Sequence, residues 1–327
     1  MSLVSRHRAL AGLAVGLPVS AIFLWLAVRE ADLDRVWSML GEAAAGEVAL
    51  AVLAMLAVYA FQAVRWRLIA GRTIVSATRF YELVVSGVAC NNVLPARLGD
   101  LLRARWLGRA ARIPAGRALG TVVLDRGFDL AALVVLLGLG LLGVASADWL
   151  APIAVGGAAG VLALGAAVAF ARAYTSRRER GRRTRGLLRR VLRDLAEQLA
   201  APLGRRRLGQ WLALSLAAWI VWALGAVLVA RALGIELAPL EALFVAAVMN
   251  LGVAIPSSPG FVGTYEWLGV ASLGLLGVPA NEALAFAVLL HAAWYVPTTL
   301  VGGAALAVRA LVGASLLRAP PPPEVAD

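Results

Sequence analysis

The stretch NLGVAIPSSPGFVG at residues 250–263 interrupts an apolar segment that otherwise runs from about 241 to 277. Proline and glycine disfavour continuation of a helix. The segment is therefore predicted to form two helical arms of about 12–15 residues, each about 18–22 Å long. Arms of that length reach mid-membrane without crossing it, and irregular backbone at that depth must be buried or line a wet cavity. We predict a re-entrant helical hairpin.

A second apolar segment, from about 80 to 107, is broken in the same way by CNNVLPARLGD at 90–100. The two segments share landmarks, because Pro95-x-x-x-Gly99 recurs as Pro259-x-x-x-Gly263, 164 residues later. Long apolar spans flank both, so the unit of span, hairpin and span is predicted twice, at about 48–144 and 211–309. The residues expected to shape the hairpins are Pro95, Gly99, Pro256, Pro259, Gly260 and Gly263.

The composition of the 327-residue chain is that of a membrane protein. It is 61% hydrophobic and 15% charged, whereas soluble domains average about 45–50% and about 25%. An all-α polytopic membrane protein is predicted, with six full spans and the two re-entrant hairpins. The first span follows Arg6 and Arg8 but lacks a signal-peptidase site, so it is interpreted as a retained anchor. The spans are expected at about 9–28, 48–64, 118–144, 149–171, 211–230 and 281–309.

Arginine placement predicts the orientation of these spans in the cell membrane. The arginine-rich segments 65–79, 103–117 and 172–209 are expected to be cytoplasmic, and the segments 29–47 and 231–241 external. Both termini, residues 1–8 and the proline-rich tail 311–327, are then cytoplasmic. Because the extra span at 149–171 separates the two units, the repeat is predicted to be inverted. Secondary transporters built this way bind substrate where the repeats meet.

Several functions are disfavoured by the residues that are missing. All 31 basic residues are arginine, so the lysine of an ATP-binding phosphate loop is absent. One cysteine and two histidines are too few for a typical zinc site, so neither a metal nor a cofactor is expected. The Gly138-x-Gly140-x-x-Gly143 pattern falls inside a predicted span and is interpreted as close helix packing rather than dinucleotide binding.

Charged and polar side chains inside the membrane segments are the candidate substrate-binding residues, because such residues usually pair or face a cavity. Asp100 falls in the first turn of a returning arm, where the helix dipole favours an acid, and Glu266 has the corresponding position in the second hairpin. The candidates are Asn91, Asn92, Arg97, Asp100, Arg103, Asp125, Arg126, Asp129, Asn250, Tyr265, Glu266 and His291.

Two of these interpretations stay open. Asp125 and Asp129 share a helix face and need a nearby cation, for which Arg126, Arg97 and Arg103 are the candidates. A structural ion-pair lock accounts for this group as well as substrate binding does. A lone histidine at mid-span, His291, is interpreted as a hydrogen-bonding packing residue in preference to a proton relay.

The basic segment 172–209 contains a helical stripe of leucine and valine with arginines alongside it. This pattern is typical of an amphipathic helix on an anionic cytoplasmic leaflet. Membrane lipids are therefore the expected partners, and nucleic acid is not. The stripe consists of Leu187, Leu188, Val191, Leu192, Leu195 and Leu199.

Three motifs together resemble the lysylphosphatidylglycerol synthase transmembrane family, the flippase-like domain of multiple peptide resistance factor. The resemblance covers about 10–310, with Asp100 standing where glutamate is expected and Pro256-Ser257-Ser258-Pro259-Gly260 where a plainer Pro-Gly-Gly is common. The motifs are Asn91-x-x-x-Pro95-x-Arg97-x-Gly99-Asp100-x-x-Arg103, Asp125-Arg126-x-x-Asp129 and Pro259-Gly260-x-x-Gly263-x-x-Glu266.

The resemblance implies a transporter that moves a phospholipid or polyprenyl-phosphate lipid between leaflets, and a stand-alone member that lacks the aminoacyl-transferase domain. Enzymatic activity is accordingly not expected. Relatives beside or fused to glycosyltransferases keep two alternatives open. One is a membrane subunit or enzyme of lipid glycosylation or aminoacylation, with a glycosyltransferase or lipid synthase as partner. The other is a non-catalytic membrane scaffold.

Overall fold

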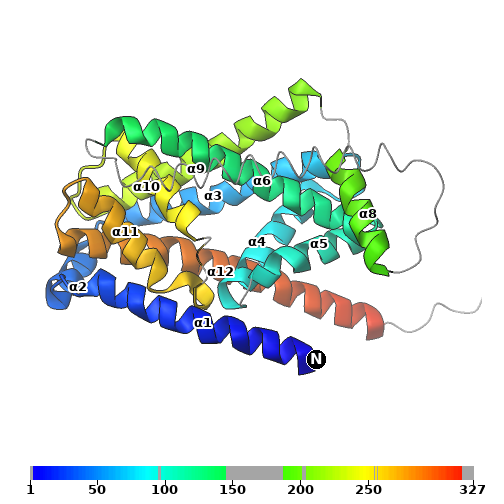
Figure 1. The fold of residues 1–327 in the computed structure, drawn as a ribbon, viewed down its shortest axis with the longest axis horizontal. Helices are drawn as coiled ribbons and strands as arrows, with labels where there is room; N and C mark the ends of the chain where they lie inside the picture. The colour runs from blue at the N-terminus through cyan, green and yellow to red at the C-terminus, as the bar shows by residue number, and fades with distance from the viewer. Residues whose placement is uncertain are drawn as a thin grey trace, which may run out of the picture.

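The structure, a computed structural model, describes residues 3–94, 97–144, 187–200, 204–253, 255 and 257–318. All the regular elements in these ranges are helices, and the longest run roughly along the long axis of the molecule (Figure 1). In chain order they are α1 (Leu3–Val28), α2 (Leu33–Glu42), α3 (Ala45–Ala70), α4 (Ala77–Val93), α5 (Leu98–Ala111), α6 (Ala115–Gly140), η2 (Leu141–Gly143), α8 (Leu187–Ala200), α9 (Arg205–Ala232), α10 (Pro239–Gly252), η4 (Pro259–Phe261), α11 (Thr264–Leu275) and α12 (Ala280–Arg318).

The prediction of an all-α membrane protein is confirmed at the level of class. Three of the described helices are long and apolar enough to cross a membrane: Ala45–Ala70, Arg205–Ala232 and Ala280–Leu311. The 26-residue α6 is as long as α3 but carries Asp125, Arg126 and Asp129. The predicted span 149–171 and much of the basic segment 172–209 lie outside the described residues, so the count of six spans stays a prediction.

The helix that corresponds to the second predicted span is longer than predicted, and its added length places Arg65 inside the protein. It was expected to end at 64 with Arg65 in a cytoplasmic loop, whereas α3 continues to Ala70 and Arg65 is fully buried. Arg103, also assigned to a cytoplasmic segment, is buried in α5. The two differences have the same cause. Each arginine pairs with an aspartate inside the protein, and the distribution of arginines along the chain does not indicate such a pair.

Both interrupted segments form two helices separated by a break, as predicted. In each case the two arms contact one another, α4 with α5 across residues 94–97 and α10 with α11 across residues 253–263. Gly99 allows the first pair to approach closely, because a Cβ there would lie 1.9 Å from the Gly87 carbonyl oxygen. Gly260 and Gly263 adopt left-handed φ angles of 79° and 87° in the second break. Pro95 and Pro256 lie outside the described residues.

Contacts between helices keep the same pattern when the two units are exchanged. The pairs α4–α12 and α10–α6 show this most clearly. The last helix of the second unit, α12, packs on α4, and the last helix of the first unit, α6, packs on α10. Each contact is close at a glycine: a Cβ on Gly302 would lie 2.2 Å from the Val85 carbonyl oxygen, and one on Gly140 2.5 Å from the Phe244 nitrogen. The contact between α3 and α9 is unchanged by the exchange, because it joins equivalent helices. Further contacts that correspond to one another are α5–α6 and α11–α12, α3–α6 and α9–α12, and α6–α9 and α12–α3.

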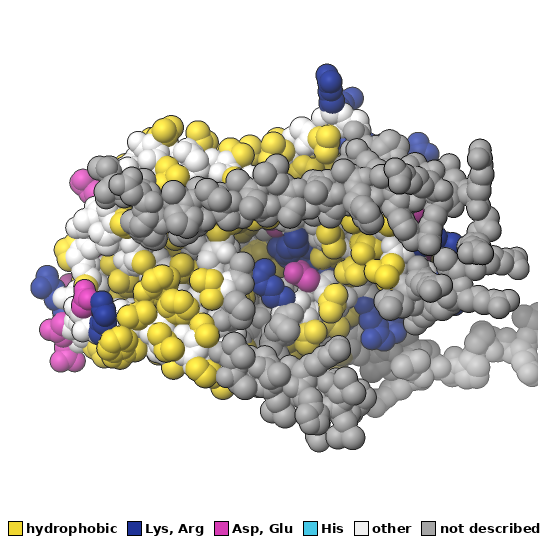
Figure 2. Space-filling model, viewed as in Figure 1, with side chains coloured by type: hydrophobic (Ala, Val, Ile, Leu, Met, Phe, Trp, Pro, Cys, Tyr) yellow, Lys and Arg dark blue, Asp and Glu magenta, His cyan; other side chains and the backbone are white. Residues whose placement is uncertain are grey.

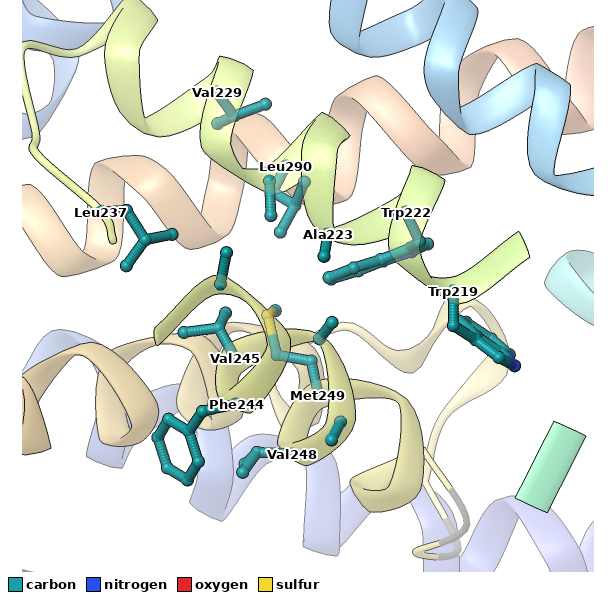
Figure 3. Close-up of a cluster of buried hydrophobic side chains, with 14 of the residues drawn as sticks. Trp219, Trp222, Ala223, Val229, Leu237, Phe244, Val245, Val248, Met249 and Leu290 are labelled. Atoms are coloured by element: carbon teal, nitrogen blue, oxygen red, sulfur yellow. The ribbon is translucent and has the colours of Figure 1, made fainter. Parts of the chain in front are cut away.

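The largest apolar cluster of the described residues extends over α3, α6 and α9 to α12, and includes the contact of α9, α10 and α12. Figure 3 shows Trp222 and Ala223 of α9 facing Val245 and Met249 of α10, with Leu290 of α12 beside them. Close packing of these side chains holds the second hairpin against the spans, because helices in a membrane associate through van der Waals contacts. Of the glycines interpreted as packing residues, Gly140 and Gly143 lie against α10, but a Cβ added at Gly138 would meet no described residue within 4 Å.

The amphipathic helix α8 packs on the protein with part of its stripe. Leu195 and Leu199 join an apolar cluster with Leu124 of α6 and Trp211 of α9. Leu192 is 53% exposed, and Arg193 beside it is exposed too. The apolar stripe is therefore shared between the protein and the surroundings, and contact of the basic side chains with an anionic leaflet stays a prediction.

Candidate functional site

A cluster of three arginines and three aspartates lies between α3, α5 and α6, with Arg65, Arg103, Asp125 and Asp129 buried and Asp100 and Arg126 partly exposed. Arg65 lies at its centre, and its Nε donates to Asp125 Oδ1 at 2.8 Å while its Nη1 donates to Asp129 Oδ1 at 2.7 Å. The same Nη1 also donates to Ser215 Oγ of α9 at 2.5 Å. We call the group Arg65, Asp100, Arg103, Asp125, Arg126 and Asp129 the buried ion-pair cluster.

The other two arginines complete the cluster. Arg103 donates to Asp125 Oδ2 at 2.7 Å and lies 3.2 Å from Asp100 Oδ1, with its guanidinium over the Trp66 ring. Arg126 donates to Asp100 Oδ1 at 3.0 Å and to Asp129 Oδ2 at 3.1 Å. Three positive and three negative charges balance, which is the condition under which buried ions are tolerated.

Arg97 is a fourth arginine at the same place, and it occupies a different environment. It adopts a left-handed φ of 51°, a strained conformation that non-glycine residues rarely keep outside functional sites. Its Nη2 donates to the Val253 carbonyl at 2.8 Å, and its guanidinium lies 6.0 Å from the centre of the Phe261 ring. Phe261 itself has a left-handed φ of 62°. Arg97 therefore joins the first break to the second.

The charge on Arg97 is not balanced locally. Among the residues that the structure describes, no carboxylate lies within 4.0 Å of its guanidinium, whereas each arginine of the buried ion-pair cluster contacts two. Because the cluster is neutral, Arg97 leaves an excess positive charge where the two breaks meet. An arginine in this situation is suited to an anionic group that arrives from outside.

A cavity of about 350 Å³ lies between the two breaks, and Arg97 is part of its wall. In Figure 2, dark blue and magenta side chains lie in a hollow at the middle of the face, among yellow ones. The wall combines charged, amide and aromatic groups from both units. It is made of Val58, Tyr59, Gln62, Val88, Asn91, Asn92, Arg97, Asp100, Arg126, Asp129, Leu130, Leu133, Trp219, Trp222, Asn250, Leu251, Val253, Phe261, Tyr265 and Trp294.

Most of the residues predicted from sequence meet at this cavity. Arg103 and Asp125 do not line it, because they lie behind its wall in the buried ion-pair cluster. Of the cations considered for Asp125, Arg103 takes that role, and the expected pair of Arg126 and Asp129 forms. The predicted residues that line the cavity are Asn91, Asn92, Arg97, Asp100, Arg126, Asp129, Asn250 and Tyr265.

Glu266 and His291, the other two candidates for substrate binding, do not line the cavity. Glu266 lies 2.5 Å from His291 Nδ1, and both side chains are buried beside Tyr265, which lines the cavity. The prediction that His291 is a hydrogen-bonding packing residue agrees with this contact and with its position beside the Tyr265 ring, 4.5 Å between centres.

Sequence reasoning missed Arg65 and the aromatic wall of the cavity. One signal for Arg65 was available, because three aspartates near Arg103 and Arg126 require a third cation if Arg97 is engaged elsewhere. Trp219 and Trp222 were counted only as residues of an apolar span. In the structure Trp219 Nε1 donates to Asp129 Oδ1 at 3.2 Å, which connects the aromatic wall to the buried ion-pair cluster.

Comparison with known proteins identifies a family and a relative of the chain. The family described as "Lysylphosphatidylglycerol synthase TM region" matches residues 10–302. The protein named "Glycosyltransferase AglD" from Haloferax volcanii is 29% identical over 333 aligned positions, which cover 89% of this chain and 53% of that protein. The chain thus spans about half the length of this relative.

Proposed function

Because the chain belongs to the lysylphosphatidylglycerol synthase transmembrane-region family, we propose that it is a lipid translocase that moves a phosphate-bearing lipid between leaflets. The observation that carries the proposal is the cavity between the two breaks, with Arg97 as a cation that no described carboxylate balances. A phosphate would neutralise that charge. The lipid is a phospholipid or a polyprenyl-phosphate lipid.

The size of the cavity is suited to a headgroup. About 350 Å³ falls at the lower end of ligand pockets, which typically measure about 300–1,000 Å³. The acyl or prenyl chains would remain in the bilayer while the headgroup enters the protein. Asn91, Asn92 and Asn250 offer hydrogen bonds to phosphate or glycerol oxygens, and the aromatic rings provide an apolar wall.

Arginine is the suitable residue for this contact. Its planar guanidinium binds phosphate through two parallel hydrogen bonds, which a lysine ammonium cannot reproduce. The three arginines of the buried ion-pair cluster are already paired, so they hold the wall of the cavity in place while Arg97 takes the substrate. A cationic headgroup would find Asp100 and Asp129 on the same wall.

We further propose that the two units form an inverted repeat whose re-entrant hairpins meet near mid-membrane. The exchange-symmetric contacts and the junction of Arg97 with Val253 and Phe261 support this arrangement. It requires the predicted span at 149–171 between the units, a multi-pass topology and cytoplasmic termini. An inverted repeat would allow the same cavity to open alternately toward either leaflet.

A leaflet-resolved lipid assay in proteoliposomes tests the proposed function. Labelled phospholipids and a labelled polyprenyl phosphate are placed in one leaflet, and their appearance in the other is followed with protein and with protein-free vesicles. Transport of one lipid class above the protein-free rate is the expected result. If neither class moves, the translocase assignment is wrong.

The second candidate is a membrane subunit or enzyme of lipid glycosylation, and the name of the Haloferax relative is the observation that favours it. In that case a partner glycosyltransferase would act on the lipid held in the cavity. A scaffold, the remaining alternative, would bring the partner to the membrane without holding lipid. Sugar transfer to a lipid acceptor by the purified protein or its complex, without movement of lipid, supports this candidate. Partner binding that survives Arg97→Ala without lipid binding supports a scaffold.

A further inference from the structure

Glu266 and His291 form an isolated buried acid–base pair next to the cavity. His291 Nδ1 lies 2.5 Å from Glu266 Oε1, and Glu266 Oε2 accepts a hydrogen bond from the Gly263 backbone nitrogen at 2.5 Å. The two residues are only 7% and 6% exposed. The other ring nitrogen, His291 Nε2, is buried without a hydrogen-bond partner among the described residues. Buried polar atoms of native proteins nearly always have a hydrogen-bond partner, so an unpaired one calls for an explanation.

The pair occupies the same position in the second unit as Asp100 and Arg126 do in the first. Asp100 and Glu266 each fall in the first turn of the returning arm, α5 and α11. Their partners lie on the next long helix, Arg126 on α6 and His291 on α12. The repeat therefore carries two equivalent acid–base pairs. Arg126 is permanently charged, whereas His291 is a histidine, the side-chain type whose charge changes near neutral pH.

The charge on His291 would be felt at the cavity wall. The imidazole lies 4.5 Å from the Tyr265 ring centre and 5.8 Å from that of Trp294, and both rings line the cavity. A protonated imidazole attracts an aromatic ring more strongly than a neutral one does. Protonation would thus tighten the contact of His291 with these two rings, which also stack on one another at 5.7 Å.

Among the described residues, no other charged side chain forms an ion pair with Glu266 or His291 within 4.0 Å. The titratable side chains around it are Tyr265 of α11, Tyr295 of α12, whose ring is 5.6 Å from the imidazole, and Tyr59 of α3, which accepts a hydrogen bond from Trp294. On α1, Ser20 bonds to Ser258, and on α10 the acid Glu241 caps Ala238 at the far end of its helix. Three charges on neighbouring helices have partners elsewhere: Arg65 in the buried ion-pair cluster, Arg79 with Glu82 on α4, and Arg231 of α9 with Glu47 of α3. The charged residues of α2, which also packs on α12, are exposed: Asp34, Arg35 and Glu42.

We propose that Glu266 and His291 form a proton-binding site that couples proton uptake to lipid movement, an inference that rests on the proposed translocase function. In the unprotonated state the Nδ1–H of neutral His291 donates to the Glu266 carboxylate. A proton from the aqueous phase adds to the Nε2 lone pair, and the second unit then holds an ion pair equivalent to that of Asp100 and Arg126. Loss of the same proton returns the site to its neutral-base form. A transmembrane proton gradient would thus bias the two states of the cavity wall.

The proton site is tested first without any transport measurement. His7 is the second of only two histidines, so His7→Gln leaves His291 as the single histidine signal in a ¹⁵N-histidine-labelled sample in nanodiscs. The shift of Nε2 is followed from pH 4 to pH 9. The expected result is a change from the unprotonated to the protonated value within that range, with a titration that moves in Glu266→Gln. An Nε2 shift that stays constant overturns the proposal.

Coupling is tested by transport in vesicles with and without a pH gradient. His7→Gln serves as the control, and wild type and control are expected to respond to the gradient by about fivefold or more. His291→Arg, which makes the second pair permanently charged like the first, is expected to transport at a rate the gradient does not change. A gradient response that persists in His291→Arg overturns the coupling. A titrating His291 in a protein that moves no lipid refutes the translocase function and leaves the proton site standing.

Discussion

Removal of Arg65 is expected to destabilise the protein strongly, because this side chain is the central cation of the buried ion-pair cluster. It is fully buried and contacts Asp125, Asp129 and Ser215 within 2.8 Å. In Arg65→Ala the two arginines Arg103 and Arg126 would face three aspartates, which leaves one buried negative charge uncompensated. Breaking a buried pair in this way costs about 3–5 kcal/mol.

A second substitution separates the charge from the lost contacts. Arg65→Met removes both the positive charge and the hydrogen bonds of Arg65. Arg65→Met combined with Asp125→Asn leaves two arginines and two aspartates in the cluster, so its charges balance again. The double variant is expected to be more stable than the sum of the two single losses predicts, by about 0.5–3 kcal/mol. This coupling energy is the part of the cost that comes from charge balance.

The assay is equilibrium unfolding of the purified variants in mixed detergent micelles, followed by circular dichroism. Arg67→Met is the control, since Arg67 is an exposed arginine on the same helix two residues later. If Arg65→Met is as stable as Arg67→Met, or if the two losses in the double variant simply add, the cluster is not held by charge balance and the reasoning is wrong.

Two further predictions concern packing and orientation. Gly99→Ala should abolish a monodisperse folded peak in size-exclusion chromatography, because the new Cβ would meet the Gly87 carbonyl oxygen at 1.9 Å. Gly138→Ala, whose Cβ would meet no described residue within 4 Å, should elute like wild type, and equal profiles would contradict the packing of α4 on α5. In a Cys90→Ser background, Arg112→Cys and Asp34→Cys should label from opposite sides of the membrane, Arg112 from the cytoplasm. Labelling from the same side would remove the topology on which the inverted repeat depends.

The breaks could be predicted from the sequence because their cause is local. Proline and glycine clusters interrupt helices wherever they occur, and the matching Pro95-x-x-x-Gly99 and Pro259-x-x-x-Gly263 spacing revealed the repeated unit. The contact of Arg97 with Val253 and Phe261 joins residues more than 150 positions apart. Nothing in the local pattern specifies such a contact, so only its general location was predicted, from the expected meeting of the hairpins.

Arg65 and α8 show why other features could not be predicted. A charge that follows an apolar run looks the same whether it lies in a loop or pairs inside the protein, and the difference depends on aspartates 60 residues later. An amphipathic stripe likewise fits a membrane surface or a protein surface. The stripe of α8 meets Leu124 and Trp211, which the periodicity of α8 alone does not indicate.

Comparison of Arg97→Lys with a matched control tests whether Arg97 binds the phosphate of a transported lipid. Arg112 is that control, because it is also an exposed arginine with a left-handed φ, at the opposite end of α5 and away from the cavity. Lipid transport, expression and thermal stability are measured for Arg97→Lys, Arg112→Lys and wild type. Phosphate binding by Arg97 predicts impaired transport in Arg97→Lys alone, with the expression and stability of all three proteins alike. Normal transport by Arg97→Lys, or a transport defect accompanied by loss of the folded protein, would contradict it.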